Sequence, residues 1–426
     1  MALRVAAVGT AGPVWTKFPI RSLTTGSTRA MTAESRHIDS GRQASYLFGM
    51  HSLDDLLHPV SPEQFRAEYV GRKPLHIPAA GDERKAGVLT WADFNRLLGQ
   101  GSLWTSDHLR LMRNYVAVPA DQYCHPVATP HGEVMRPWAQ KVEVFLSGGA
   151  SLIANDVLTI HEPLMRIGET LSRTFAASIG ANIYCSFQGI QAFGTHFDNH
   201  DVVVIQTGGT KVWNLYENRA DNPIENFPDD ANTKRWFEQS RGSLMQQVTM
   251  QAGDVLYLPR GWYHDALATD GPSLHVTFAI TPLHGRSLLA LLNIEAMKDP
   301  AYRAFAPPSH QDGGAALAAH LANYGQILAR IAASPAFGEE VASAQTRMTP
   351  RPAAFSLPER KPVTLYRTTG RSFPACPAAV RETYDWAIEE RQFALEDMVA
   401  QFQSLLEDDV RAGVAAAEAA GAVQRL

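Results

Sequence analysis

Three side chains that could bind a metal ion stand in two short motifs in the middle of the chain. His196 and Asp198 belong to the run GTHFDNHD, residues 194–201, and are two positions apart. Side chains at positions i and i+2 of a strand point to the same side, so a strand would present this imidazole and this carboxylate together. The spacing therefore predicts that both project into the mouth of one β-barrel.

A second motif supplies another imidazole. It reads GDVLYLPRGWYH over residues 253–264. The Gly-Asp pair leads out of a turn into a strand, and Pro259 ends that strand because proline cannot donate a ladder hydrogen bond. His264 then follows at the mouth of the same barrel. Two histidines and one carboxylate can occupy one face of an octahedral metal ion, which indicates non-haem Fe(II) oxygen chemistry.

Other side chains compete for these roles. His275 is an alternative third ligand, but we prefer His264 because it closes the motif Gly-Asp…Pro-x-Gly-x-x-His. His200 and Asp201 offer a second imidazole and carboxylate, which we expect in a solvated turn before the next strand. A single His-x-Asp is more often a surface turn than a metal site, so the interpretation depends on both motifs occurring together.

Together the two motifs resemble those of a known family. HFD followed by GDVLYLPRGWYH is similar to the JmjC branch of the cupin superfamily, in particular to its ribosomal-oxygenase-like Fe(II)- and 2-oxoglutarate-dependent hydroxylases. The similarity covers about residues 48–285 and includes the segments YVGRKPLHI, residues 69–77, and NDV, residues 155–157. It implies a double-stranded β-helix, the cupin or jelly-roll core, with flanking helices.

The resemblance also assigns roles to particular residues. It implies that the Fe(II) ligands are His196, Asp198 and His264. It further implies a set of side chains that hold the cosubstrate 2-oxoglutarate, with a lysine at the distal carboxylate and three polar groups beside it: Lys211, Tyr184, Thr277 and Asn182.

The alternation of side chains supports a polar lumen independently of the resemblance. Asn182 and Tyr184 share one face of their strand, and His275 and Thr277 share one face of theirs. Lys211 lies on the strand after HFD, where its long stem could reach a carboxylate deep in the barrel. One polar face towards the lumen and one packed face is what a ligand-holding barrel requires.

The elements that must position these side chains change character along the chain. Before residue 180 we expect amphipathic helices, one starting at Ser61-Pro62, one near Trp91 and one over 164–179 closed by Gly180. Over 180–282, short strands follow one another with turn signals that include a hairpin at Gly208-Gly209. This order predicts an antiparallel sandwich or barrel within an α+β fold.

Helical periodicity returns after residue 282. We expect helices over 288–297, 315–331 and 384–406, a short strand within 361–366, and a fraying alanine-rich surface helix over 412–422. The expected domains are four: a disordered leader or wrongly assigned start over 1–45, an oxygenase domain over 46–285, a helical dimerisation region over 286–345 and a small winged-helix-like unit with its tail over 346–426. The identities of the last two rest on the resemblance.

Composition excludes several classes of protein. The 426 residues carry 38 basic and 43 acidic side chains, a net charge of -5, which argues against bulk nucleic-acid binding. No apolar stretch reaches the ~18 residues of a membrane span. The three cysteines are far apart, which argues against a disulfide framework and favours a reducing, cytoplasmic location. Residues 1–33 contain no acidic side chain, so organelle import through a leader is the alternative.

The hypothesis is a dioxygenase that uses Fe(II), 2-oxoglutarate and O2 to hydroxylate a side chain of a protein or peptide, releasing succinate and CO2. The resemblance favours an arginine or histidine of a ribosomal protein as the acceptor and a homodimer as the assembly. Three alternatives stay open: demethylation by the same chemistry, hydroxylation of a small molecule or biosynthetic peptide, and a non-catalytic cupin that only binds metal or ligand.

Overall fold

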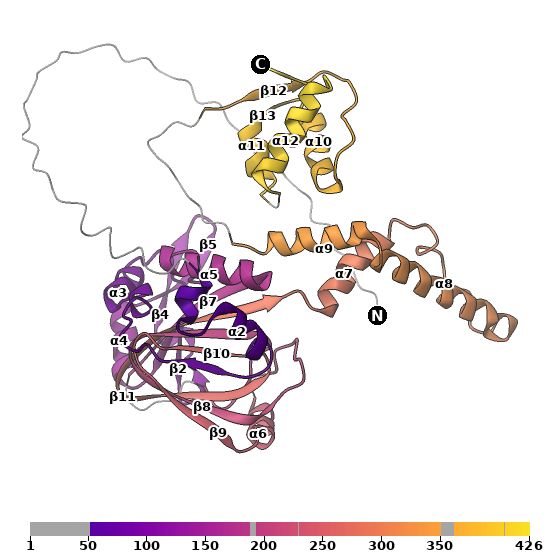
Figure 1. Cartoon of the computed structure of the whole chain (residues 1–426). Coiled ribbons are helices and arrows are strands. Elements are labelled where there is room, and N and C mark those ends of the chain that lie inside the picture. The colour runs from indigo at the N-terminus through magenta and orange to yellow at the C-terminus, as the bar shows by residue number, and fades with distance from the viewer. Residues whose placement is uncertain (1–51, 188–192, 229, 351–361, 404) are drawn as a thin grey trace, which may run out of the picture. The chain divides into compact units, whose positions relative to one another are not determined.

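A computed structural model describes residues 52–187, 193–228, 230–350, 362–403 and 405–426 of the chain. The expected leader over 1–45 lies outside these residues. Within these residues, the main sheet contains nine antiparallel strands, and its long strands can be followed in Figure 1. The nine strands are β1 (Leu75–Ile77), β2 (Leu109–Arg113), β3 (Val116–Ala117), β6 (Ser151–Ala154), β7 (Ala177–Ser186), β8 (Asp201–Arg219), β9 (Leu244–Met250), β10 (Val255–Leu258) and β11 (Trp262–Pro282).

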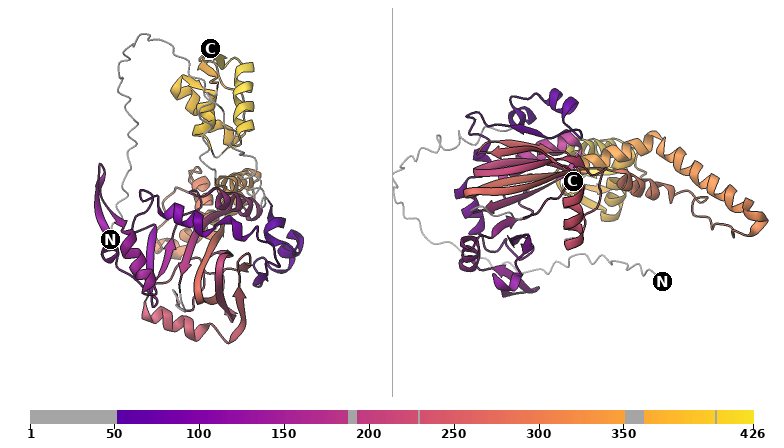
Figure 2. Two further views of the ribbon diagram at one scale, coloured as in Figure 1. Left: turned by 90° about the vertical axis from the view of Figure 1, so that its left-hand side faces the viewer. Right: turned by 90° about the horizontal axis from the view of Figure 1, so that it is seen from below.

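The strand order is β1-β10-β8-β11-β7-β6-β2-β3, with β9 paired to β8. The long strands β7, β8 and β11 therefore run side by side (Figure 2). A separate hairpin joins β4 (Cys124–Thr129) to β5 (Gly132–Pro137). The expected antiparallel cupin-type sheet is confirmed, and it also recruits strands from before residue 180.

Helices precede the long strands. They are α1 (Leu53–Leu57), α2 (Pro62–Glu68), α3 (Trp91–Leu98), α4 (Ala139–Ser147) and α5 (Glu162–Phe175), with short 3-10 turns at Ala86–Val88 and Ala120–Gln122. Ser61 caps α2 as expected, and Thr90 caps α3 in a reciprocal capping box with Asp93. A further helix, α6 (Ala231–Ser240), lies between β8 and β9 in the sequence.

The expectation of a helix continuing to residue 179 is wrong. α5 ends at Phe175, Ala176 adopts a left-handed conformation with φ of 47°, and β7 begins at the next residue. Burial along 177–184 alternates with a period of two, and Gly180 pairs with Ala279 inside the sheet. The boundary is not visible in the sequence because Leu171, Phe175 and Ile179 are four residues apart, which continues the helical spacing into the strand.

The expected hairpin at Gly208-Gly209 is also wrong. β8 continues through both glycines, pairing with β10 over Val202–Ile205 and with β9 from Lys211 to Tyr216. Gly209 has a φ of +63°, and opposite it the register of β11 shifts between Ala268 and Ser273. The glycines therefore mark an irregularity within one long strand.

The two faces of the sheet bury different apolar sets. The face towards the barrel lumen carries one compact cluster: Val202, Val204, Trp213, Leu215, Val248, Met250, Leu256 and Leu258. Side chains of opposite parity, among them Val203, Ile205 and Phe278, join the larger core that includes residues of α1, α2 and α5. The cluster changes from even to odd positions of β8 across Gly208-Gly209, so the irregularity keeps both halves of the strand facing the lumen.

After β11, the described part of the chain forms six helices and three short strands. They are α7 (Gly285–Ala296), α8 (Ala315–Ala332), α9 (Pro335–Arg347), α10 (Ala378–Glu390), α11 (Leu395–Gln401), α12 (Glu407–Ala419), β12 (Leu365–Thr368), β13 (Gln392–Ala394) and β14 (Val423–Arg425), with a 3-10 turn at Gln311–Gly314. The strands form a sheet in the order β13-β12-β14. The domain boundaries expected at 285 and 345 stay predictions.

Two expectations for this region are wrong. The helix expected over 384–406 is interrupted at Arg391, where φ is 63°, and Phe393 is buried in the short strand β13. The segment 412–422 does not fray at the surface: α12 buries Val410, Val414 and Ala417. Small side chains allow this packing, since a Cβ on Gly413 would lie 2.7 Å from Val380 Cγ1. Within the described residues, no helix is long and apolar enough to cross a membrane.

Candidate metal centre

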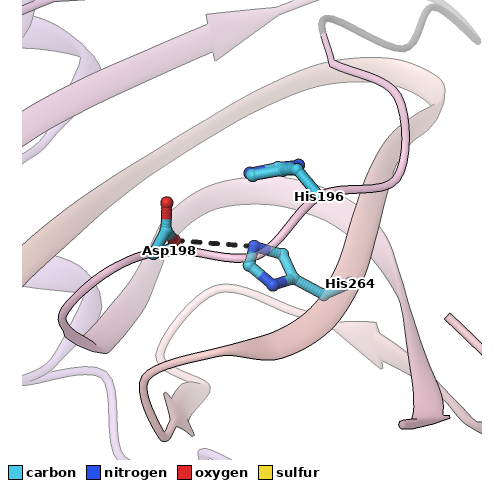
Figure 3. Close-up of side chains that lie close together, drawn as sticks. All are labelled: His196, Asp198 and His264. Atoms are coloured by element: carbon cyan, nitrogen blue, oxygen red, sulfur yellow. Dashed lines mark ion pairs between the residues drawn. The ribbon is translucent and has the colours of Figure 1, made fainter. Parts of the chain in front are cut away.

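His196, Asp198 and His264 converge as the two motifs predict (Figure 3). One ligand atom from each residue lies within 4.8 Å of the others. His264 Nε2 is 3.7 Å from Asp198 Oδ2. In the part of the chain that the structure describes, this is the one group of three or more His, Cys, Asp or Glu side chains with metal-site spacing.

The first motif is not a strand, although the structure brings its two ligands together. His196 forms an isolated bridge with His264 on β11, through reciprocal backbone hydrogen bonds of 3.0 and 2.8 Å. The Gly261 amide donates to the backbone carbonyl of Asp198 at 2.9 Å. Phe197 joins a separate aromatic cluster with Tyr216 and Tyr263. The side chains of His196 and Asp198 therefore lie on the same side, as they would in a strand, although residues 196–198 do not belong to a strand.

Backbone carbonyls fix the tautomers of both histidines. His196 Nδ1 lies 2.9 Å from the Gly194 carbonyl, and His264 Nδ1 lies 2.8 Å from the Trp262 carbonyl. A carbonyl oxygen can only accept, so Nδ1 of each ring carries a hydrogen atom, which leaves Nε2 as the nitrogen that can bind a metal ion when the ring is neutral. This arrangement is typical of metal-ligating histidines.

The charges in the group suit a divalent cation. Burial, together with the neighbouring His196, lowers the pKa of His264 to about 4, so this ring is neutral at neutral pH. Burial alone would raise the pKa of Asp198, but His196, His264 and His200 outweigh it and lower the pKa below its usual value. A neutral imidazole and an ionised carboxylate are the protonation states that metal binding requires.

The side chains expected to hold 2-oxoglutarate lie on strands of the same barrel. Lys211 is 4% exposed, and burial lowers its pKa to about 8. It stands opposite Met250 and two residues before Trp213, both of which belong to the lumen cluster. Tyr184 pairs with His275, and Asn182 pairs with Thr277, on the neighbouring strands β7 and β11.

Aromatic rings connect the group of His196, Asp198 and His264 with the side chains expected to hold 2-oxoglutarate. The Trp213 ring lies 5.8 Å from the His264 ring and 5.8 Å from the His275 ring, measured between centroids. His275 in turn stacks on Tyr184, with centroids 4.9 Å apart and planes 4° apart. Asn182 differs from the others, because its side-chain oxygen already accepts a hydrogen bond from the Asp156 amide at 3.2 Å.

The alternative ligands do not join the metal group. His275 is stacked on Tyr184, and burial lowers its pKa well below the usual value, with Lys211 contributing. Asp201 is not in a solvated turn as expected: it begins β8, and its carboxylate accepts from Tyr257 Oη and from the Arg260 amide, both at 2.7 Å. Asp201 therefore has a structural role at the start of its strand.

A second polar group, which the two motifs do not indicate, lies beside the candidate metal centre. Asp265 follows His264, is 4% exposed and accepts hydrogen bonds from Thr195, Asn214 and Tyr216. A signal was present, because Asp265 is a charged residue that precedes the run Ala266-Leu267-Ala268 in a strand. A buried carboxylate in such a place must find hydrogen-bond partners.

Comparison with known proteins identifies the segment that contains all three residues. Residues 158–288 match the family model described as JmjC domain. This segment is a JmjC domain. The resemblance seen in the two motifs is thereby confirmed, and so is the cupin-type fold that it implies.

Curated relatives of the JmjC domain have oxygenase names. The chain is 29% identical over 240 residues to ribosomal oxygenase 1 of Gallus gallus, a match covering 56% of this chain and 37% of that protein. It is 29% identical over 226 residues to the bifunctional lysine-specific demethylase and histidyl-hydroxylase NO66 of Dictyostelium discoideum, covering 53% and 42%. Less than half of either relative's length is therefore matched.

Among solved structures, the ribosomal oxygenase YcfD of Escherichia coli overlaps 86% of this chain and 98% of its own, with a TM-score of 0.47 and 14% identity. A likeness at this level does not bear on activity.

Proposed function

We propose that the chain is an Fe(II)- and 2-oxoglutarate-dependent oxygenase that hydroxylates a side chain of a protein or peptide. The observation that carries the proposal is the convergence of His196, Asp198 and His264 inside a JmjC domain, with Nδ1 of both imidazoles hydrogen-bonded to a backbone carbonyl. This donor set leaves half of an octahedral coordination sphere for cosubstrate and oxygen, as the proposed chemistry needs.

The residues present fit both groups. Two imidazoles and one carboxylate within 4.8 Å suit Fe(II). Among the described residues, two buried polar atoms of the lumen find no hydrogen-bond partner, Trp213 Nε1 and His275 Nδ1, and a polar ligand could satisfy them. When bound, Fe(II) with 2-oxoglutarate would supply the activation of O2, with oxidation of the cosubstrate to succinate and CO2.

Each lumen residue then has a role. His196, Asp198 and His264 hold the metal ion. The Lys211 ammonium binds the distal carboxylate of 2-oxoglutarate, and the hydroxyl groups of Tyr184 and Thr277 donate hydrogen bonds beside it. The apolar cluster around Trp213 and Leu215 excludes water from the site. Asn182 contributes through its amide nitrogen, because its oxygen is already bonded to Asp156.

The acceptor is proposed from the names of the relatives. One is a ribosomal oxygenase and the other a demethylase and histidyl-hydroxylase, so an arginine or histidine of a ribosomal protein is favoured. Mass spectrometry of the host proteome, with and without the protein, should find a peptide that gains one oxygen atom. Loss of a methyl group from a lysine would instead support demethylation.

A homodimer and a cytoplasmic location complete the proposal. Three apolar side chains of α7 and α8 are at least half exposed in the single chain: Leu289, Ile294 and Leu321. Apolar side chains that a subunit interface covers are exposed in this way when one subunit is viewed alone. Cys124, Cys185 and Cys376 are all free thiols, as expected in a reducing compartment.

Substitution of the ligands tests the activity. His196→Ala and Asp198→Ala should each abolish succinate formation coupled to a substrate, because a two-ligand site loses the metal or its geometry. His200→Ala is the matched control, since this histidine lies in the same motif outside the triad, and it should keep most of the activity. Undiminished turnover in both ligand variants would contradict the proposal, whereas metal binding without any turnover by the wild type would favour a non-catalytic cupin.

A further inference from the structure

A buried carboxylate lies directly behind the metal centre. Asp265 follows His264 on β11, and because neighbouring strand residues point to opposite sides, its side chain leaves the lumen. Its carboxylate accepts from Thr195 Oγ1 at 3.0 Å, from Asn214 Nδ2 at 2.9 Å and from Tyr216 Oη at 2.5 Å. We call these four residues together with Arg241 the outer network.

Arg241 closes the outer network and balances its charge. One guanidinium nitrogen lies 3.8 Å from Asp265 Oδ2 and donates to Thr195 Oγ1 at 3.0 Å. The same nitrogen donates to Tyr216 Oη, and the guanidinium carbon lies 4.3 Å from the centroid of the Tyr216 ring. Thr195 Oγ1 thus donates to a carboxylate and accepts from a guanidinium cation. The Thr195 residue is 4% exposed.

The outer network acts where the sheet holds His196 weakly. His196 is tied to the sheet by a single bridge and belongs to no strand, whereas His264 lies within the long strand β11. Thr195 is the chain neighbour of His196, and Asp265 is the neighbour of His264. The hydrogen bond between Thr195 and Asp265 therefore joins the two ligand-bearing segments a second time, from the side opposite the metal.

We propose that Thr195 and Asp265 are positioning residues, which fix His196 relative to His264 and so set the affinity of the triad for its metal ion. Metal sites require ligands held to within about 0.5 Å, and supporting hydrogen bonds commonly provide this precision. The inference rests on the proposed function in that it needs the triad to bind a divalent cation.

The test is titration of the full chain with Co(II), which has visible absorption bands that report ligand geometry. Thr195→Val removes the hydroxyl group at nearly constant volume and should weaken Co(II) binding about tenfold and change the absorption spectrum. Thr195→Ser keeps the hydroxyl group and should restore both. Thr207→Val is the matched control, because its hydroxyl group donates to the Leu274 carbonyl at 3.2 Å on the same sheet, and it should bind Co(II) as the wild type does.

Tyr216→Phe provides a second variant if Thr195→Val does not fold. It removes one hydroxyl group of the outer network, keeps the ring under Arg241, and should also weaken Co(II) binding. Wild-type affinity and spectrum in a folded Thr195→Val protein, or equal weakening by Thr207→Val, would overturn the positioning role alone. A wild-type chain that does not bind Co(II) would overturn the proposed function as well.

Discussion

At the scale of single residues, Lys211 shows a conflict between stability and the proposed chemistry. Its ammonium is buried beside the apolar cluster of the lumen, and this burial lowers its pKa from 10.5 to about 8. A difference of this size corresponds to about 3 kcal/mol that the folded protein loses when the lysine is charged. A buried cation of this kind is expected where an anion must be bound.

The pKa of Lys211 predicts a pH dependence for cosubstrate binding. Below about pH 8 the ammonium is charged and can bind a carboxylate, and above it the neutral amine cannot. The value of kcat/KM for 2-oxoglutarate should therefore be level below this pH and fall up to about tenfold per pH unit above it, measured by succinate formation. Lys211→Arg stays charged throughout, so its profile should lack this fall. A level wild-type profile through pH 9 would contradict a role for the charge.

Replacing Lys211 should stabilise the protein while it removes binding. The folded pKa is below the unfolded value, so the folded state binds fewer protons, and the free energy of unfolding rises between about pH 8 and 10.5. Lys211→Met removes this cost and should raise the unfolding free energy at pH 7 by about 2 kcal/mol, measured in urea. Lys85→Met is the control: Lys85 is buried but donates to the His58 carbonyl at 3.0 Å, so its loss should destabilise. A less stable Lys211→Met protein would show that the ammonium has favourable contacts.

At the scale of elements, β8 carries the site because an irregularity divides it. Before Gly208 its even positions face the lumen, and after Gly209 its odd positions do, which places Lys211 and Trp213 inside. A regular strand would turn one of these halves outward, since a shift of one residue exchanges the faces. The glycines are therefore as important for the position of Lys211 as any residue in the lumen.

Gly209→Ala tests this dependence. The backbone there has a φ of +63°, and a Cβ atom would lie 1.7 Å from the Pro272 carbonyl oxygen, so the backbone must move. We expect a loss of about 2–3 kcal/mol in the free energy of unfolding, with weaker binding of 2-oxoglutarate. Gly180→Ala, whose Cβ would meet Ala279 Cβ at an ordinary 3.8 Å, should leave both unchanged. Equal effects of the two substitutions would refute a special role for Gly209.

The sequence allowed the triad to be predicted because His196 and Asp198 stand in one short motif, and because this motif and the one that ends at His264 together resemble a known family. It did not reveal the course of β8, because two adjacent glycines favour a hairpin turn and only the partner strands β9 and β10 decide otherwise. The role of Asp265 was hidden for the same reason: its partners Thr195 and Tyr216 are 70 and 49 residues away. Local patterns predict elements and local pairs, whereas contacts at long range in the sequence require the fold.

Helix α12 illustrates the same limit. Its alanine-rich sequence has no large apolar face, which favours a surface helix. In the structure, Val410 and Val414 join a separate small core with Tyr384 and Met398 of α10 and α11. Small residues such as Gly413 allow two helices to come into close contact. The sequence of one helix, however, does not show which other helix packs against it.

At the scale of the whole molecule, the region after the barrel is marked by uncovered apolar side chains. In the part of the chain that the structure describes, α7, α8 and α9 contact one another, yet each buries a single hydrophobic residue: Ala296, Ile327 and Phe337. Helices of 12, 18 and 13 residues normally bury a whole face. Their exposed faces carry Leu289, Ile294 and Leu321, each more than half exposed. A second copy of the chain, as proposed above, would cover these side chains.

The oligomeric state tests this step. The full-length chain should be a dimer in light scattering after size-exclusion chromatography, and Ile294→Glu combined with Leu321→Glu should make it a monomer, because two charges would be buried without partners at the interface. Leu244→Glu changes a leucine of similar exposure on β9 and should leave the dimer intact. The proposed metal ligands lie outside α7 to α9, so the monomer should still bind Co(II) as the wild type does. If the wild type is a monomer, the proposal that α7 to α9 form a subunit interface is wrong, whereas the proposal for the metal centre is unaffected.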